Sequence, residues 1–174
     1  MNIVLIGPMG AGKTTVGKIL AGSLDMKYIS VDKEAHKLAG PGITKTYQIH
    51  ERWGVGRYRT LLTRVISSLL KRDGLIVDCG EGIVVLPEKE KKLKAIGKVI
   101  LLIAKPEILW KRIKYSEPRT YFLSKEGDPY EIYKRNLRLN KPFFSIADIK
   151  IDTTALTPEE MVERVVKELK KKKE

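Results

Sequence analysis

The chain has 174 residues, and its 34 lysines and arginines outnumber its 21 aspartates and glutamates, which leaves a net charge of +13. This length suits one domain over residues 1–174, and an apolar content of 43% excludes wholesale disorder. The single cysteine, Cys79, excludes an internal disulfide, and two histidines are too few for a zinc site. The longest apolar runs are far shorter than a membrane span, so we expect a cytoplasmic protein that does not enter a membrane.

Five short apolar segments are predicted to be β-strands. The first ends at Gly7, and the third follows a break at Gly74. In chain order, the predicted strands are 2–6, 27–31, 75–78, 98–104 and 148–151.

Apolar residues at helical spacing fill most of the sequence between these strands. The segment 115–127 contains Pro118 and Gly127 and is predicted to be a loop. One helix begins at or just after Asp32 and ends before the Gly-Pro-Gly at 40–42. The other predicted helices are 13–24, 43–53, 56–71, 87–94, 106–114, 129–140 and 158–173.

Strands that alternate with helices imply right-handed crossovers and a mostly parallel sheet. Because such a sheet carries helices on both faces, we expect an α/β protein with three layers.

The segment Gly7–Thr14 fits G-x-x-x-x-G-K-[ST], the phosphate-binding P-loop. Glycines such as Gly10 and Gly12 let backbone N–H groups surround phosphate oxygens. The helix that begins at Lys13 directs its positive end at the same anion. The Lys13 ammonium can reach the outer phosphates, and the Thr14 hydroxyl can hold Mg²⁺. The alternative is a chance glycine-rich turn, which the strand before it and the helix after it argue against.

A P-loop indicates nucleoside triphosphate binding but does not specify the reaction. The chain has no N-K-x-D segment for guanine recognition, and 174 residues are few for an ATPase motor. We therefore expect a small kinase that uses ATP and Mg²⁺.

Asp78 is a second candidate metal group. It ends an apolar strand, where P-loop proteins place the acid that orients Mg²⁺. The alternative is a surface turn residue, although Gly80 and Gly82 nearby favour a close approach of the backbone to a ligand.

These motifs, in this order and spacing, resemble the shikimate kinase family over nearly the whole chain. The P-loop, with its Ala11, continues into Thr15-Val16-Gly17, as in that family. Asp32 matches the aspartate that acts on the substrate hydroxyl, although it could instead simply cap its helix. In the segment 54–59, which fits G-x-x-x-[FY]-R, Arg59 matches the arginine that binds the substrate carboxylate.

Further matches follow along the chain. Gly80, Glu81 and Gly82 match in part the family's substrate-binding glycine triplet. Arg112 matches the arginine beside the adenine, and Arg119 matches the lid arginine that reaches the phosphates. The resemblance implies a five-stranded sheet of order 2-3-1-4-5, a lid over about 115–127, and a substrate-binding helical region over about 32–62. It also implies phosphoryl transfer from ATP to the hydroxyl of a small metabolite.

Several positions depart from the family pattern. Ser30 replaces the first of two aspartates at the end of the second strand, while Asp78 stands where the family has a weakly acidic or hydroxyl residue; the Mg²⁺ role could therefore have moved to Asp78. Uncharged side chains replace two acidic residues at Val55 and Leu62. A late carboxylate-binding arginine falls near Leu139, and a one-residue slip would place Arg138 there, with Arg135 also close.

Glu81 stands at the central glycine of the triplet. At about 4 Å and an effective dielectric near 20, its repulsion of an anionic substrate would cost on the order of 4 kcal/mol. The acceptor could therefore be a neutral polyol or an amine-bearing alcohol rather than shikimate, unless Glu81 points away or pairs with Arg59.

Two other functions remain open at this point. A nucleotide or nucleoside kinase would use several arginines on one helix, here Arg52, Arg57, Arg59 and Arg64. A nucleotide-gated RNA-binding or assembly factor would suit the basic charge, but the sequence lacks interleaved aromatic residues, so we expect no nucleic-acid partner. We expect a monomer or a homodimer.

Overall fold

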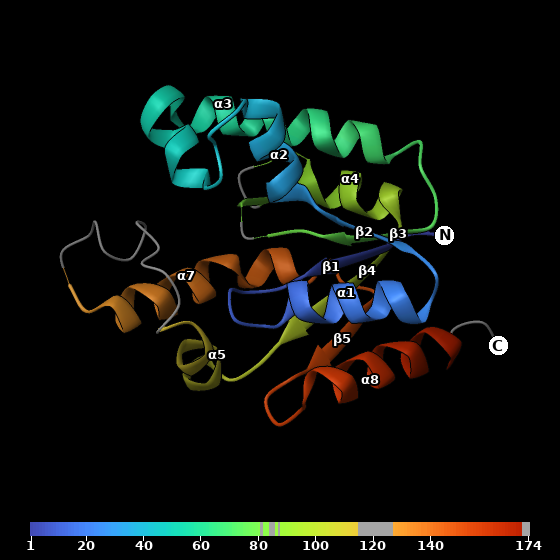
Figure 1. Ribbon diagram of the computed structural model, residues 1–174. Helices are drawn as coiled ribbons and strands as arrows, with labels where there is room; N and C mark the ends of the chain where they lie inside the picture. Colours follow the sequence, from blue (N-terminus) through green and yellow to red (C-terminus); the bar gives the residue numbers. More distant parts are fainter. Residues whose placement is uncertain (81, 84–85, 87, 115–126, 172–174) are drawn as a thin grey trace.

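A computed structural model describes the chain except for residues 81, 84–85, 87, 115–126 and 172–174. Five parallel strands form one sheet in the order β2-β3-β1-β4-β5 (Figure 1). The strands are β1 (Ile3–Ile6), β2 (Lys27–Ser30), β3 (Leu75–Asp78), β4 (Lys98–Ile103) and β5 (Ile149–Asp152). The expected α/β fold and strand order are confirmed.

The helices follow the predicted pattern closely. They are α1 (Lys13–Ser23), α2 (Val31–Ala39), α3 (Thr46–Leu69), α4 (Lys89–Ile96), α5 (Pro106–Ile113), α7 (Pro129–Phe144) and α8 (Pro158–Lys171). The largest difference is in α7, which we expected to end at Asn140 but which continues through Pro142 to Phe144. The proline costs one backbone hydrogen bond there, but the extra turn buries Phe143 and Phe144.

The sheet is covered on both faces because alternate residues of each strand point in opposite directions. Ile3 and Leu5 of β1 join an apolar cluster with residues of α1 and α8, whereas Val4 and Ile6 join a cluster with residues of α3 and α4. Figure 1 shows the same division, with α3 and α4 on one side of the sheet and α1 and α8 on the other. Three layers result.

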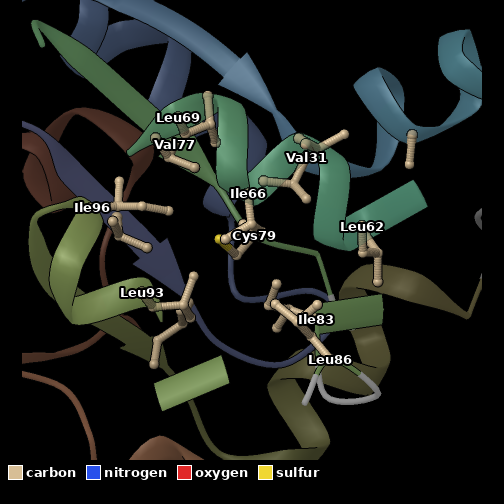
Figure 2. Packing of buried hydrophobic residues seen from close by; sticks show 14 of the residues in the cluster. Val31, Leu62, Ile66, Leu69, Val77, Cys79, Ile83, Leu86, Leu93 and Ile96 are labelled. Atoms are coloured by element: carbon tan, nitrogen blue, oxygen red, sulfur yellow. The ribbon is translucent and has the colours of Figure 1, made fainter. Parts of the chain in front are cut away.

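The cluster beneath α3 fixes the part of the molecule that leads into the site. Figure 2 shows Leu62, Ile66 and Leu69 of α3 packed near Val77 and Cys79 at the end of β3. Val31, at the start of α2, belongs to the same cluster. The carboxyl end of β3 and the amino end of α2 are therefore held by one continuous core.

Helix α3 contains a break at Gly54, whose φ of 76° and ψ of 171° are not helical. The sequence predicted two helices here, 43–53 and 56–71, and the break corresponds to the gap between them. A positive φ is the conformation that glycine adopts most readily. The break divides α3 into a first half, before residue 54, and a second half, whose apolar face is buried against the sheet.

None of the helices in the described part of the chain is both long and apolar enough to cross a membrane.

Candidate active site

The loop between β1 and α1 has the geometry of an anion-binding cradle. Gly7, Gly10 and Gly12 have φ values of 145°, 84° and 93°, which disfavour a side chain at each position. A Cβ at Gly7 would also lie 2.1 Å from the carbonyl oxygen of Leu102 on the neighbouring strand. The first turn of α1 has no acidic side chain and is preceded by glycine, so its N–H groups are available to an anion.

Lys13 lies within this loop, and its side chain is 8% exposed. Its Nζ donates to the carbonyl oxygens of Gly7 at 2.7 Å and Pro8 at 3.0 Å. The ammonium therefore already stands over the cradle, where it can exchange carbonyl oxygens for phosphate oxygens.

Asp78 accepts two hydroxyl hydrogen bonds on one oxygen. Its Oδ2 receives Thr14 Oγ1 at 2.7 Å and Tyr28 OH at 2.7 Å. Asp78 is 4% exposed. Burial of the Tyr28 hydroxyl, together with the charge of Asp78, raises the pKa of Tyr28. A buried carboxylate beside a P-loop threonine is a donor set suited to Mg²⁺, a cation that binds through oxygen ligands and waters.

Asp32 lies in the first turn of α2, but Ser30 caps that helix, accepting a hydrogen bond from the backbone N–H of Lys33 at 3.4 Å. The alternative in which Asp32 serves only as the cap is therefore wrong. The Asp32 Oδ1 accepts a hydrogen bond from Tyr58 OH at 2.7 Å. Burial raises the pKa of Asp32, the Tyr58 hydrogen bond lowers it, and the charge of Asp78 raises it again.

Gly80 and Gly82 follow β3 and make room for this pair. A Cβ at Gly80 would lie 1.8 Å from Asp32 Oδ2, and one at Gly82 would lie 2.1 Å from Tyr58 OH. Both glycines are needed because polar side chains occupy the space that a methyl group would fill.

Arg112, on α5, closes another side of the site. Its guanidinium donates to the carbonyl oxygen of Gly10 at 3.2 Å and to the carbonyl oxygen of Thr153 at 2.7 Å, with a third bond to Thr153 Oγ1 at 3.2 Å. The group is thus tied to the P-loop and to the segment that follows β5.

A cavity of about 500 Å³ joins these groups at the carboxyl ends of β1, β2 and β3. The P-loop residues Gly10, Gly12, Lys13, Thr14 and Thr15 line it, together with Asp32, Asp78, Gly80 and Arg112. This edge is where open α/β sheets bind their ligands. Four segments that are far apart along the chain therefore share one cavity.

Other predicted site residues lie elsewhere. Gly7 and Ala11 belong to the P-loop but do not line the cavity, and Gly82 lies outside it, against the Tyr58 side chain. Arg59 on α3 and Arg138 on α7 are exposed and do not line the cavity. Glu81 and Arg119, like most of the predicted lid, lie outside the described residues.

Three of the departures from the family pattern have clear structural settings. Leu62 is fully buried in the apolar core, so its position could not hold a charged partner for Arg59 without one charge being desolvated. Leu139 is 67% exposed, and Val55 is 45% exposed. Neither the Leu139 nor the Val55 side chain is buried in the core.

Three tyrosines of the site were not predicted from the sequence. Tyr58 and Tyr28 donate to the two aspartates, and Tyr133 OH donates to the carbonyl oxygen of Met9 in the P-loop at 2.7 Å. The only sequence signal for Tyr58 was its place in the G-x-x-x-[FY]-R segment. That pattern also accepts phenylalanine, so it did not predict a role for the hydroxyl group.

A family model described as "Shikimate kinase" matches residues 9–170. The chain belongs to the shikimate kinase family. A shikimate kinase from Caldicellulosiruptor bescii is 37% identical over 95% of this chain and 93% of its own length. One from Thermodesulfovibrio yellowstonii is 35% identical over 96% of this chain and 94% of its own.

Solved structures agree with this assignment. The shikimate kinase of Acinetobacter baumannii, determined in complex with shikimate, superposes with a TM-score of 0.88 at 27% identity, covering 99% of this chain and 94% of that one. The Aquifex aeolicus shikimate kinase gives a TM-score of 0.79 at 26% identity over 99% and 98%. The expected class, a shikimate kinase-like phosphotransferase, is confirmed, and neither the nucleotide kinase nor the RNA-binding alternative is favoured.

Proposed function

We propose that this shikimate kinase family member transfers the γ-phosphoryl group of ATP to a hydroxyl group of shikimate. The observation that carries this proposal is the shared cavity, which combines a P-loop, a carboxylate pair and a fixed arginine. The names of its relatives support shikimate as the acceptor.

ATP would bind with its phosphates on the backbone N–H groups of the P-loop and on Lys13, with Ala11 and Thr15 completing the cradle. The purine would lie against Arg112, whose hydrogen bonds to Gly10 and Thr153 hold the guanidinium plane in place. A planar cation fixed in this way suits stacking on an aromatic base.

Thr14 and Asp78 would hold Mg²⁺, Asp78 directly or through water. When bound, Mg²⁺ would neutralise charge on the β- and γ-phosphates. The fit rests on the hydrogen bond of 2.7 Å between the two side chains, because it leaves the lone pairs of the Thr14 hydroxyl oxygen for a cation.

Asp32 would orient the acceptor hydroxyl and take its proton. The acceptor oxygen forms a bond to the γ-phosphorus, the bond from that phosphorus to the β–γ bridging oxygen breaks, and ADP leaves. The raised pKa of Asp32 makes it a better proton acceptor than an ordinary aspartate. Arg119 would stabilise the developing charge once the lid closes.

Arg59, Gly80, Gly82 and Arg138 would bind the acceptor, with Glu81 beside them. Arg59 is exposed on α3 and does not line the cavity, so its role as the carboxylate anchor rests on its match to the family's arginine. An acceptor without a negative charge is the second candidate, because Glu81 would repel an anion.

The test is a transfer assay with radiolabelled ATP, Mg²⁺ and a panel containing shikimate, neutral polyols and amine-bearing alcohols. We expect shikimate to be phosphorylated and Lys13→Met to reduce the rate by at least about 100-fold. If a neutral alcohol is labelled but shikimate is not, the acceptor is a neutral alcohol and not shikimate. If no compound is labelled, the proposed reaction is refuted.

A further inference from the structure

One oxygen of the Asp32 carboxylate is hydrogen-bonded, and the other lies close to a glycine. Oδ1 accepts from Tyr58 OH at 2.7 Å, and Oδ2 lies 1.8 Å from where a Cβ of residue 80 would be. The Tyr58 hydrogen bond therefore restrains the orientation of the carboxylate.

Tyr58 is itself fixed from several sides. Its side chain is 1% exposed and belongs to the apolar core, and the His50 ring packs on it edge to face with centroids 5.2 Å apart. Burial and the charge of Asp32 raise the pKa of the Tyr58 hydroxyl, and Thr46, at the start of the same helix, lowers it. The hydroxyl donates to Asp32 Oδ1.

A second hydrogen bond joins the same two helices. Thr46 Oγ1 lies 2.9 Å from Nε2 of His36 on α2. It connects the start of α3 to the helix that carries Asp32.

We propose that Tyr58 is a positioning residue that keeps the Asp32 carboxylate aimed into the phosphoryl-transfer cavity, and that the Thr46–His36 pair supports it by joining the two helices. This inference rests on the proposed function of Asp32, but it adds a set of hydroxyl and imidazole groups that would act only through that carboxylate. Helices α2 and α3, which carry the set, lie side by side (Figure 1).

The groups around Asp32 determine how its titration should respond. Tyr58 from α3 lowers its pKa, Asp78 from β3 raises it, and His36 from α2 and Lys13 from α1 lower it. The Cys79 thiol, just beyond β3, also lies within the influence of the aspartate's charge. Removing the Tyr58 hydroxyl alone should therefore move the pKa of Asp32 upward.

The experiment compares Tyr58→Phe and Thr46→Val with two matched controls. Tyr130→Phe removes a hydroxyl from a ring that packs on Trp110. Thr63→Val removes a hydroxyl that bonds only the carbonyl of Arg59 within α3, at 2.9 Å. Neither control should change kcat by more than about twofold.

We expect Tyr58→Phe to lower kcat about tenfold near neutral pH, because a hydrogen bond to a charged group is lost. The KM for ATP should stay within about twofold, the acid limb of the pH–rate profile should move to higher pH, and the deficit should shrink as pH rises. Thr46→Val should show the same pattern with a smaller loss. In an Asp32→Asn background, Tyr58→Phe should have no further effect on kcat.

An unchanged kcat, a loss that is equal at every pH, or a loss that persists in the Asp32→Asn background would overturn the proposal. If the parent protein phosphorylates no acceptor, the proposed function fails. The contact between Tyr58 and Asp32 is then tested separately, by the pH dependence of the free energy of unfolding. In that case the stability difference between Tyr58→Phe and the parent should grow from about pH 4 to pH 7 and be constant with pH in the Asp32→Asn background. A constant difference in both backgrounds would overturn the role of Tyr58.

Discussion

Ser30 and Asp78 are paired residues of the adjacent parallel strands β2 and β3. Each is the last residue of its strand, so both side chains reach the edge of the sheet that faces the P-loop. The family resemblance expects an aspartate at the first position and a weakly acidic or hydroxyl residue at the second, and this chain has the opposite arrangement. The register shows that the carboxylate lies one strand away, within reach of Thr14.

This pairing predicts that Asp78 carries the metal role. Asp78→Asn should lower the rate at saturating ATP by about 10- to 100-fold and raise the Mg²⁺ concentration needed for half-maximal activity. Steady-state rates measured over a Mg²⁺ titration check this outcome. An unchanged rate and Mg²⁺ dependence would remove Asp78 from the metal site.

The exchanged pair Ser30→Asp with Asp78→Ser is the sharper version of that test. Aspartate caps helices as well as serine does, so α2 should keep its start. We expect the double variant to recover at least part of the activity that Asp78→Ser alone loses, as measured by kcat/KM for ATP. Additive losses from the two changes would show that the two positions are not interchangeable.

Gly80 predicts a different kind of loss. Gly80→Ala would place a methyl group 1.8 Å from Asp32 Oδ2, so the carboxylate must move, and turnover should fall on the order of 100-fold. Gly22→Ala is the matched control, because a Cβ there meets nothing within 4 Å in helix α1. That variant should keep full activity and gain up to about 1 kcal/mol of stability, as measured by chemical denaturation. Equal activity in the two alanine variants would contradict the close packing of Gly80 on Asp32.

Asp32 predicts a conflict between stability and activity. Because burial raises its pKa, the charged form at neutral pH is disfavoured in the folded state, and the folded protein loses stability as pH rises through that pKa. Asp32→Asn should therefore be more stable than the parent at pH 7, by about 1 kcal/mol, while its turnover collapses. Near pH 3, where the unfolded group is also mostly protonated, the gain should vanish. Unfolding curves at the two pH values check this, and a gain that is independent of pH would contradict it.

Cys79 predicts a chemical signature of the folded state. The thiol is 1% exposed, and burial raises its pKa, so little thiolate forms. Alkylation by iodoacetamide at pH 8 should be negligible over hours in the native protein and rapid in guanidinium chloride. Mass spectrometry of the intact protein measures both rates. Fast modification of the native protein would mean that the core shown in Figure 2 opens easily.

The strands and most of the helices could be predicted because their signals were local, whereas the strand order came from the family resemblance. Each strand was a short apolar run, and the P-loop motif marked where the first strand ends, at Ile6, and where the first helix begins, at Lys13. The end of α7 was predicted incorrectly because Pro142 is a helix-breaking signal, whereas burial of Phe143 and Phe144 is a tertiary effect.

In the candidate site, too, residues marked by a local motif could be predicted, and residues defined by long-range contacts could not. Lys13, Thr14 and Asp78 could be predicted because a motif or a strand end marks each of them. The hydrogen bonds of Tyr28, Tyr58 and Tyr133 could not, because each joins residues at least 26 positions apart in the chain. A tyrosine in an apolar pattern looks like a core residue, and only the folded arrangement shows where its hydroxyl points.

The break at Gly54 has a mechanical consequence. His50 lies before it and Tyr58 after it, and the edge-to-face contact of their rings, with centroids 5.2 Å apart, bridges the two halves of α3. The later half is anchored beneath the sheet, and the earlier half can swing only by pivoting at that glycine. Any such swing must stretch the bridge, so the placement of the helix arm and the alignment of the Asp32 carboxylate cannot vary independently.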